Sequence, residues 1–244
     1  MKTALITGAS GGIGLAIIKE YIKNGYFVCA QYNENVKAIN ELKDELKKTN
    51  KADYLYVVKA DLSCDEGVKS LYETAIKNFK HIDVLINNAG VDLYKLCQET
   101  TFLELDNVMA VNFKASYNLS KLFIDSMLSR GSGNILFISS VWGVKGACME
   151  TAYSASKSAL IGLTKALAKE VAPFIRVNCI TPGVIDTPMN ACFTEEEMKD
   201  VISSVPLNRI GLPTDVANLC AFLTSEKASY ITGAIVSVDG GYSL

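Results

Sequence analysis

The feature that most constrains the fold of this chain is an alternation of short apolar runs with longer amphipathic stretches, which continues along the whole sequence. The apolar runs lack polar alternation, which is typical of strands covered by helices on both faces. The expected strands cover residues 4–7, 27–32, 54–58, 84–86, 135–138, 177–180 and 235–238. The helix-like stretches begin near Ile13, Val36, Glu66, Phe102, Ala152 and Pro213. This alternation predicts an α/β fold with a doubly wound parallel sheet of about seven strands.

The domain organisation follows from the same pattern, because no linker, repeat or low-complexity segment interrupts it. We therefore predict a single domain over residues 1–244. The long segment from Pro182 to Leu212 is the exception, since it follows a strand and carries an acidic helical piece at 195–197. Ligands of open α/β sheets bind beyond the carboxyl ends of the strands. We expect a substrate lid at about 184–212.

Composition and charge exclude several classes of protein. The formal net charge is only -2, with acids and bases mixed along the chain, which excludes a nucleic-acid partner. Seven scattered cysteines without metal-ligand spacing indicate free thiols in a reducing compartment. His81 is the only histidine and is expected in a surface turn, so neither a metal site nor a Ser-His-Asp hydrolase is expected. Without a long apolar segment, we expect a soluble cytoplasmic protein that has no membrane partner.

A glycine cluster, Thr7-Gly8-Ala9-Ser10-Gly11-Gly12-Ile13-Gly14, joins the first expected strand to the first helix. Glycines let the backbone turn tightly and approach a pyrophosphate without a Cβ clash. The helix that follows offers free N–H groups and a positive dipole end to the anion. No Gly-Lys-Ser/Thr follows, so the cluster is not a P-loop. Its position between strand and helix favours a dinucleotide-binding site.

Further candidate binding residues stand at later strand ends. Asp61-Leu62 follows the third strand, where a carboxylate can accept a hydrogen bond from the adenine amino group. Asn87-Asn88-Ala89-Gly90 ends the fourth strand with small residues that allow close approach to a cofactor. At the end of the second strand stands Tyr32-Asn33, whereas an acidic residue there would repel a 2′-phosphate. NADP(H) is therefore favoured. NAD(H) is the alternative, because no cation nearer than Lys37 is present to pair with that phosphate.

The candidate catalytic residues lie in the second half of the chain. Tyr153 and Lys157 are four apart on an expected helix and so share one face. An ammonium beside a phenol stabilises the phenolate, so we expect Lys157 to lower the pKa of Tyr153 and make it an acid/base. Ser140 ends the fifth strand, where a hydroxyl can polarise a substrate carbonyl. Asn112 is a polar residue between apolar helix neighbours and can hold a water joined to Lys157.

Four motifs together make the chain similar to the short-chain dehydrogenase/reductase family over essentially its whole length. They are Thr7-Gly8-x3-Gly12-x-Gly14, Asn87-Asn88-Ala89-Gly90, Tyr153-x3-Lys157 and Pro182-Gly183, and Asn112 and Ser140 also stand at the family's expected places. The resemblance implies a Rossmann-type sheet with strand order 3-2-1-4-5-6-7 and a homotetramer built by paired long helices. The cofactor contacts expected in all are Gly8, Ser10, Gly11, Gly12, Ile13, Gly14, Tyr32, Asn33, Asp61, Leu62, Asn88, Ala89, Gly90, Tyr153, Lys157, Pro182, Gly183, Ile185 and Thr187.

The resemblance also implies a role for each catalytic residue. Tyr153 would act as acid/base, Lys157 would bind the nicotinamide ribose, Ser140 would orient the carbonyl and Asn112 would hold the relay water. Ile185 and Thr187 would bind the nicotinamide carboxamide. The expected reaction is hydride transfer between NADP(H) and a ketone/secondary-alcohol pair.

The pattern is most similar to the bacterial 3-oxoacyl-acyl-carrier-protein reductases of fatty acid biosynthesis. This implies a 3-oxoacyl thioester substrate and acyl-carrier protein as a candidate partner. One departure is the absence of a basic docking residue in Ala172-Pro173-Phe174-Ile175, for which Arg130 could substitute in part. The alternative is a dehydrogenase for a sugar, steroid or small secondary alcohol, which shares every catalytic residue and differs in the lid. A catalytically inactive dinucleotide-binding regulator is disfavoured, because the proton-transfer residues are all present.

Overall fold

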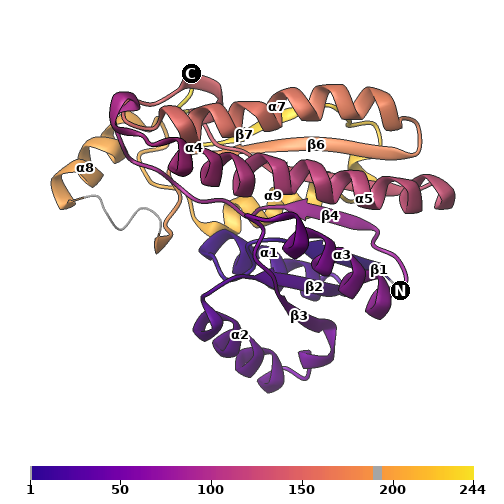
Figure 1. Ribbon diagram of the computed structural model, residues 1–244. Coiled ribbons are helices and arrows are strands. Elements are labelled where there is room, and N and C mark those ends of the chain that lie inside the picture. The colour runs from indigo at the N-terminus through magenta and orange to yellow at the C-terminus, as the bar shows by residue number, and fades with distance from the viewer. Residues whose placement is uncertain (1, 189–193) are drawn as a thin grey trace.

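The computed structural model describes residues 2–188 and 194–244, and its core is a seven-stranded parallel sheet (Figure 1). The strands are β1 (Lys2–Ile6), β2 (Tyr26–Tyr32), β3 (Leu55–Lys59), β4 (Val84–Asn87), β5 (Gly133–Ile138), β6 (Ile175–Pro182) and β7 (Ile235–Val238). Their order across the sheet is β3-β2-β1-β4-β5-β6-β7, and every neighbouring pair is parallel. The sequence-based fold class and strand order are both confirmed.

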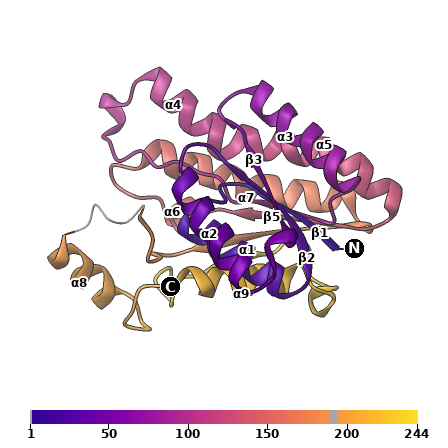
Figure 2. The same cartoon turned by 90° about the horizontal axis from the view of Figure 1, so that it is seen from below.

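Helices follow the strands and cover both faces of the sheet. They are α1 (Gly12–Lys23), α2 (Val36–Lys48), α3 (Asp65–Phe79), α4 (Phe102–Met109), α5 (Ala115–Arg130), α6 (Trp142–Lys145), α7 (Thr151–Val171), α8 (Glu195–Ser204) and α9 (Pro213–Leu223). Figure 2 shows α1, α2 and α9 on one side of the strands and α3, α5 and α7 on the other. The first residue of each expected helix agrees with the structure to within one position.

Two apolar layers result, one under each set of helices. Along every buried strand, successive side chains enter opposite layers, so Leu85 packs beneath α3 and α5 while Val84 and Ile86 pack beneath α1 and α9. This explains the lack of polar alternation in the strands, because both of their faces are inside the protein.

Strand β6 extends beyond the expected run at 177–180, and the polar residues along it are paired. The Asn178 side chain donates to the Ile231 carbonyl at 3.0 Å and accepts from the Ala234 amide at 3.0 Å. The Arg176 guanidinium donates to the carbonyls of Leu223 and Ile231. A buried polar side chain costs little when it is fully hydrogen-bonded, so neither residue ends the strand.

Phe123 provides a test of the layer beneath α5, since its ring is fully buried and lies edge-on to Tyr72 at 5.0 Å between centroids. Replacement of Phe123 by Ala should lower the free energy of unfolding by about 3–5 kcal/mol, because it removes a large apolar group and leaves a cavity. Phe102→Ala is the matched control, since that ring is exposed, and its effect should stay within about 0.5 kcal/mol. Urea denaturation of both variants measures the difference, and equal effects would contradict this packing.

Candidate active site

The candidate site forms at the carboxyl edge of the sheet because all strands run in the same direction. The segments that leave β1, β3, β4, β5 and β6 at this edge contain the glycine cluster, Asp61-Leu62, Asn88-Ala89-Gly90, Ser139-Ser140 and Pro182-Gly183. The predicted binding and catalytic motifs therefore converge on one edge of the sheet, although they are spread over most of the sequence.

Thr7 and Asn88 join the glycine cluster to the end of β4. The Thr7 hydroxyl accepts from the backbone amides of Asn88 and Ala89, each at 3.0 Å. In return, the Asn88 side chain donates to the carbonyls of Thr7 at 2.9 Å and Gly8 at 3.1 Å. These four bonds hold the turn after β1 against the turn after β4.

Glycine is required at two places in this turn. Gly8 has a φ of 64°, and a Cβ on it would lie 2.7 Å from the Cα of Ala89. A Cβ on Gly14 would lie 2.3 Å from the carbonyl oxygen of Gly8. Both contacts are with backbone, so a side chain at either position would displace the loop itself.

The loop fits the pyrophosphate of a dinucleotide. Helix α1 begins after Gly11, which has no side chain to cap the first turn, so an anion can take the amide groups there. Thr187, which follows β6, lies against Gly12, since a Cβ on that glycine would be 2.8 Å from its methyl carbon. The structure thus brings the predicted carboxamide-binding segment beside the predicted pyrophosphate loop.

Gln31 is a residue of this site that the sequence reasoning missed. It is the second-to-last residue of β2, and its buried amide contacts both the glycine cluster and the end of β3. A buried glutamine next to Tyr32-Asn33 was the available signal, because a buried amide in a strand needs partners.

The adenosine end of the site is more exposed. The Asp61 carboxylate accepts from the Ser63 amide at 2.9 Å, which lowers the pKa of Asp61, and Leu62 is buried below it. Tyr32 is half-buried and Asn33 is exposed. Lys37, the cation proposed for a 2′-phosphate, points into solvent and lies 4.0 Å from Glu41.

Tyr153 and Lys157 share the buried face of α7, as predicted. The Lys157 amine donates to the Ile138 carbonyl at 3.0 Å and lies 5.6 Å from the centroid of the Tyr153 ring. Burial lowers the pKa of Lys157 to about 8, while Cys179 and Asp92 act in the opposite direction. The Ser139 hydroxyl donates to the Lys157 carbonyl at 2.8 Å and fixes this turn of α7 to the end of β5.

The expectation that Lys157 lowers the pKa of Tyr153 is wrong for this arrangement. Burial raises the pKa of the Tyr153 hydroxyl well above its ordinary value, and the charges of Asp92 and Glu150 raise it further. A hydrogen bond with Ser140 acts in the opposite direction and is weaker than burial. The Lys157 amine is directed at the Ile138 carbonyl, which leaves desolvation as the dominant effect on the phenol. Tyr153 therefore holds its proton at neutral pH.

Asn112 lies in a π-helical turn, Ala110–Lys114, between α4 and α5. Its side chain accepts from the Val91 amide at 2.8 Å and donates to the Val91 carbonyl and the Ser156 hydroxyl, each at 2.9 Å. Asn112 thus holds the segment after Gly90 against the catalytic helix. Local π-helical turns are frequent at functional sites, and here the turn directs a polar group into a helix-packed interior. The water relay through Asn112 stays a prediction.

The predicted lid is described only in part, because residues 189–193 lie outside the described residues. Its first residues are joined to its last ones through parallel pairing of Ile185 with Gly211. Pro182 and Gly183 lie at the carboxyl edge, where Gly183 packs against Asp239. Helix α8 extends outward from this region in Figure 1.

Arg130, which the sequence suggests as part of a basic docking patch, is paired with groups of its own chain. Its guanidinium is bound to the Asp83 carboxylate at 2.6 Å and to the Ile82 carbonyl at 2.9 Å. These partners precede β4, so Arg130 lies at the amino edge of the sheet, opposite the candidate site. His81 lies at that edge too, 3.6 Å from Asp83, and takes no part in the site.

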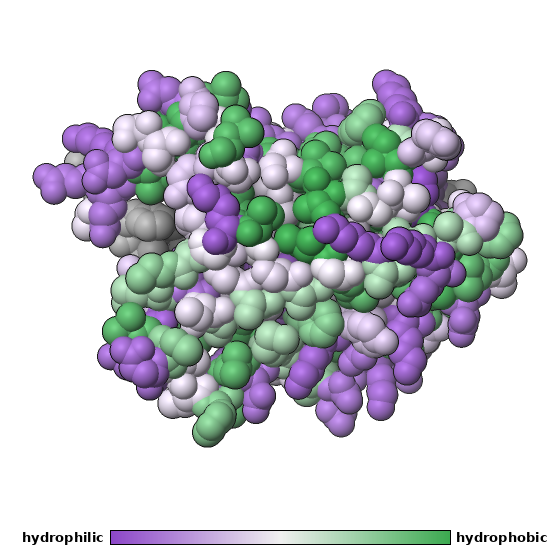
Figure 3. All heavy atoms as spheres, turned by 90° about the horizontal axis from the view of Figure 1, so that it is seen from above, coloured by the Kyte–Doolittle hydropathy of each residue, from purple (hydrophilic) through white to green (hydrophobic). Residues whose placement is uncertain are grey.

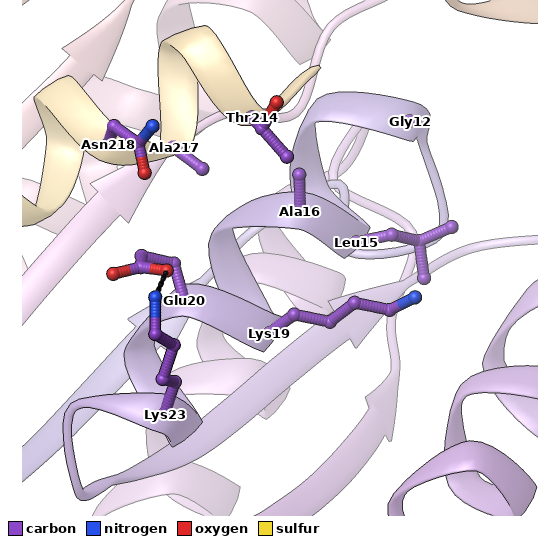
Figure 4. Close-up of a pocket in the computed structure, with 9 residues that line it drawn as sticks. All are labelled: Gly12, Leu15, Ala16, Lys19, Glu20, Lys23, Thr214, Ala217 and Asn218. Atoms are coloured by element: carbon purple, nitrogen blue, oxygen red, sulfur yellow. Dashed lines mark hydrogen bonds and ion pairs between the residues drawn. The ribbon is translucent and has the colours of Figure 1, made fainter. Parts of the chain in front are cut away.

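A surface cavity of about 290 Å³ lies between α1 and α9 (Figure 4). It is lined by Gly12, Leu15, Ala16, Lys19, Glu20, Lys23, Thr214, Ala217 and Asn218. Both lysines already have acidic partners, Lys19 with Glu45 at 2.6 Å and Lys23 with Glu20 at 3.2 Å. It shares Gly12 with the glycine cluster but none of the catalytic side chains.

Within the described residues, no cluster of histidine, cysteine, aspartate and glutamate side chains could hold a metal ion. In the same residues, no helix is both long and apolar enough to cross a bilayer. The Ser140, Tyr153 and Lys157 side chains are the candidate chemical groups, because they lie at the same sheet edge as the glycine cluster.

The fold and the site define a dinucleotide-binding oxidoreductase that acts on alcohol and carbonyl groups. The family model of the short chain dehydrogenases matches residues 2–198, and the chain belongs to that family. It is 38% identical over 242 residues to the uncharacterized oxidoreductase YmfI of Bacillus subtilis, covering 99% of this chain and 98% of that protein. It is 36% identical over 241 residues to the 3-oxoacyl-acyl-carrier-protein reductase FabG of Staphylococcus aureus strain Mu50, covering 98% and 97% of the two chains. FabG of Thermotoga maritima is similar to the same extent, with 36% identity over 243 residues.

Gly14→Ala tests the glycine loop. The new methyl group must push the Gly8 carbonyl and the loop outward, so affinity for NADPH or NADH should fall about tenfold or more, equivalent to about 1.4 kcal/mol. Gly162→Ala is the matched control, because that helical position faces open space. The control should raise stability by about 0.5–1 kcal/mol and leave affinity unchanged. Fluorescence titration and thermal unfolding measure both effects, and unaltered affinity in Gly14→Ala would exclude this loop geometry.

Glu150 provides a pH test. Partial burial and the charge of Asp92 raise the pKa of this carboxyl from 4.5 to about 7 in the folded protein. The folded state therefore binds the proton more tightly than the unfolded chain, and stability should fall as pH rises from about 4.5 to 7. Glu150→Gln removes this dependence. The difference in unfolding free energy, wild type minus variant, should decline between about pH 4.5 and 7 and stay constant at higher pH. A difference that does not change with pH would contradict the raised pKa.

Proposed function

We propose that the protein reduces a ketone to a secondary alcohol with NADP(H), and that its substrate is a 3-oxoacyl thioester. The observation that carries the reaction type is the placement of Ser140, Tyr153 and Lys157 beside the glycine loop at one sheet edge. The FabG relatives, named as 3-oxoacyl-acyl-carrier-protein reductases, support the substrate. Acyl-carrier protein is then the proposed carrier of that substrate.

The chemistry of reduction fits the protonation states of these residues. A reduced nicotinamide, when bound, supplies the hydride. The Tyr153 hydroxyl, which is protonated at neutral pH, donates its proton to the carbonyl oxygen. The Ser140 hydroxyl donates a hydrogen bond to the same oxygen. Lys157, with a pKa of about 8, is mainly an ammonium at neutral pH and would hold the ribose of a bound cofactor.

The preference for NADP(H) over NAD(H) is supported by the end of β2. A carboxylate at the position of Tyr32 would repel a 2′-phosphate, and Tyr32 is not acidic. Lys37 is 86% exposed and held only loosely by Glu41, so it is free to turn toward such a phosphate. NAD(H) with a sugar, steroid or small secondary alcohol is the second candidate, favoured by the absence of a basic residue from the glycine cluster, Thr7 to Gly14.

The proposal includes a homotetramer in the cytoplasm. Apolar residues gather on the face seen in Figure 3, the side on which α7 lies in Figure 1. Helix α5 also exposes Tyr117 and Leu128, which suits the pairing of long helices between subunits. All six cysteines in the described residues are unpaired, in keeping with a reducing compartment. Sedimentation of the purified protein measures the subunit number.

The activity test follows absorbance at 340 nm with an acetoacetyl thioester and either NADPH or NADH. Turnover with NADPH should fall by about 10²–10⁴ in Tyr153→Phe, since this is the usual cost in rate of removing a positioned proton donor. Cofactor affinity should stay the same. Tyr21→Phe is the matched control, because that hydroxyl is also buried but bonds to Thr224, and it should retain activity.

The outcomes separate the chemistry from the substrate. Loss of turnover in Tyr153→Phe alone supports the proposed acid and the thioester substrate. Cofactor binding without thioester turnover would reject the acyl substrate and favour the second candidate. Equal activity of Tyr153→Phe and wild type would reject Tyr153 as the proton donor.

A further inference from the structure

Gln31 connects three segments of the candidate cofactor site through one buried side chain. Its Oε1 accepts from the Gly8 amide at 2.9 Å, and its Nε2 donates to the Ala60 carbonyl at 2.7 Å. Its own backbone carbonyl accepts from the Ala9 amide at 2.8 Å. The residue is 2% exposed, so water cannot replace these bonds when they are lost.

The two partners of the side chain require opposite chemistry. The Gly8 N–H needs an acceptor and the Ala60 C=O needs a donor, and an amide provides both from one group. A carboxylate at position 31 would bond Gly8 but repel the Ala60 carbonyl. An apolar side chain of similar size would leave both backbone groups without this partner.

The position of these partners connects Gln31 to cofactor binding. Gly8 opens the loop that fits the pyrophosphate, and Ala60 directly precedes Asp61-Leu62, the predicted adenine contacts. Tyr32 and Asn33, which are among the expected cofactor contacts, follow Gln31 itself. Thr7 and Asn88 hold the other side of the loop to β4, so Gln31 is what joins it to β2 and β3.

We propose that Gln31 is a positioning residue for the dinucleotide, setting the separation between the pyrophosphate loop and the adenine-binding edge. The inference rests on the proposed function in so far as that function requires a nicotinamide dinucleotide. Gln31 touches no reacting atom, so it acts on cofactor affinity and leaves the chemical step unchanged.

The test compares Gln31→Glu and Gln31→Leu with matched changes at Asn178. Asn178 is an equally buried amide that also accepts from one backbone N–H and donates to one backbone C=O, but it joins β6 to the turn before β7. Asn178→Asp and Asn178→Leu therefore reproduce the loss of bonding and of stability away from the proposed cofactor contacts. The readouts are the Kd of NADPH and NADH by fluorescence titration, the Tm without cofactor, and kcat and KM for the cofactor.

Both Gln31 variants should weaken cofactor binding about tenfold or more, with kcat at saturating cofactor within about twofold of wild type. Both Asn178 variants should lower Tm but keep the wild-type Kd. If Gln31→Glu weakens cofactor binding and Gln31→Leu does not, the cause is charge repulsion of the cofactor, and the positioning role is overturned. Equal changes of Kd in the Gln31 and Asn178 pairs would overturn it too, since the effect would then come from general stability.

If the two leucine variants fail to fold, the comparison of Gln31→Glu with Asn178→Asp decides by the ratio of their Kd values, and a ratio near one rejects the proposal. Wild-type protein that binds neither NADPH nor NADH would reject the proposed function together with this inference. Wild-type binding that the Gln31 changes leave unaltered would reject the inference alone.

Discussion

The structure depends on the close backbone contact between the turn after β1 and the turn after β4. Gly8 approaches Ala89 so closely that no side chain fits between them, and the hydroxyl of Thr7 and the amide of Asn88 hold the contact. Parallel strands bring these turns to one edge, and Gln31 extends the same hydrogen-bonded connection to β2 and β3. These connected turns form the carboxyl edge of the sheet, along which a dinucleotide can lie.

The candidate catalytic groups lie next to these turns, in an interior where desolvation determines their protonation. Burial raises the pKa of Tyr153 and lowers that of Lys157 to about 8, so both groups carry a proton at neutral pH. The bond from Ser139 to the Lys157 carbonyl and the bond from Asn112 to the Ser156 hydroxyl hold α7 to neighbouring segments, and both are buried. Preorganisation of this kind is the main protein contribution to stabilising developing charge.

Two acidic side chains, Asp92 and Glu150, help to raise the pKa of Tyr153. Lys95, whose backbone pairs with that of Glu150, directs its amine to Glu104 at 2.9 Å. Arg130 is held at the opposite edge by Asp83.

The sequence by itself determined the parallel sheet, its strand order through the family motifs, and the convergence of the glycine cluster, Ser140, Tyr153 and Lys157. These follow from local patterns, because strand direction and helical spacing place such residues without knowledge of distant contacts. Only the tertiary structure decided the pKa direction of Tyr153, the bonding of Asn112, the pairing of Arg130 with Asp83 and the hydrogen bonds of Gln31. Each of these depends on partners 21 to 47 residues away, such as Val91, Asp83 and Gly8, or on burial by several elements together. Desolvation and long-range hydrogen bonds are properties of the packed chain, and no local pattern of residues encodes them.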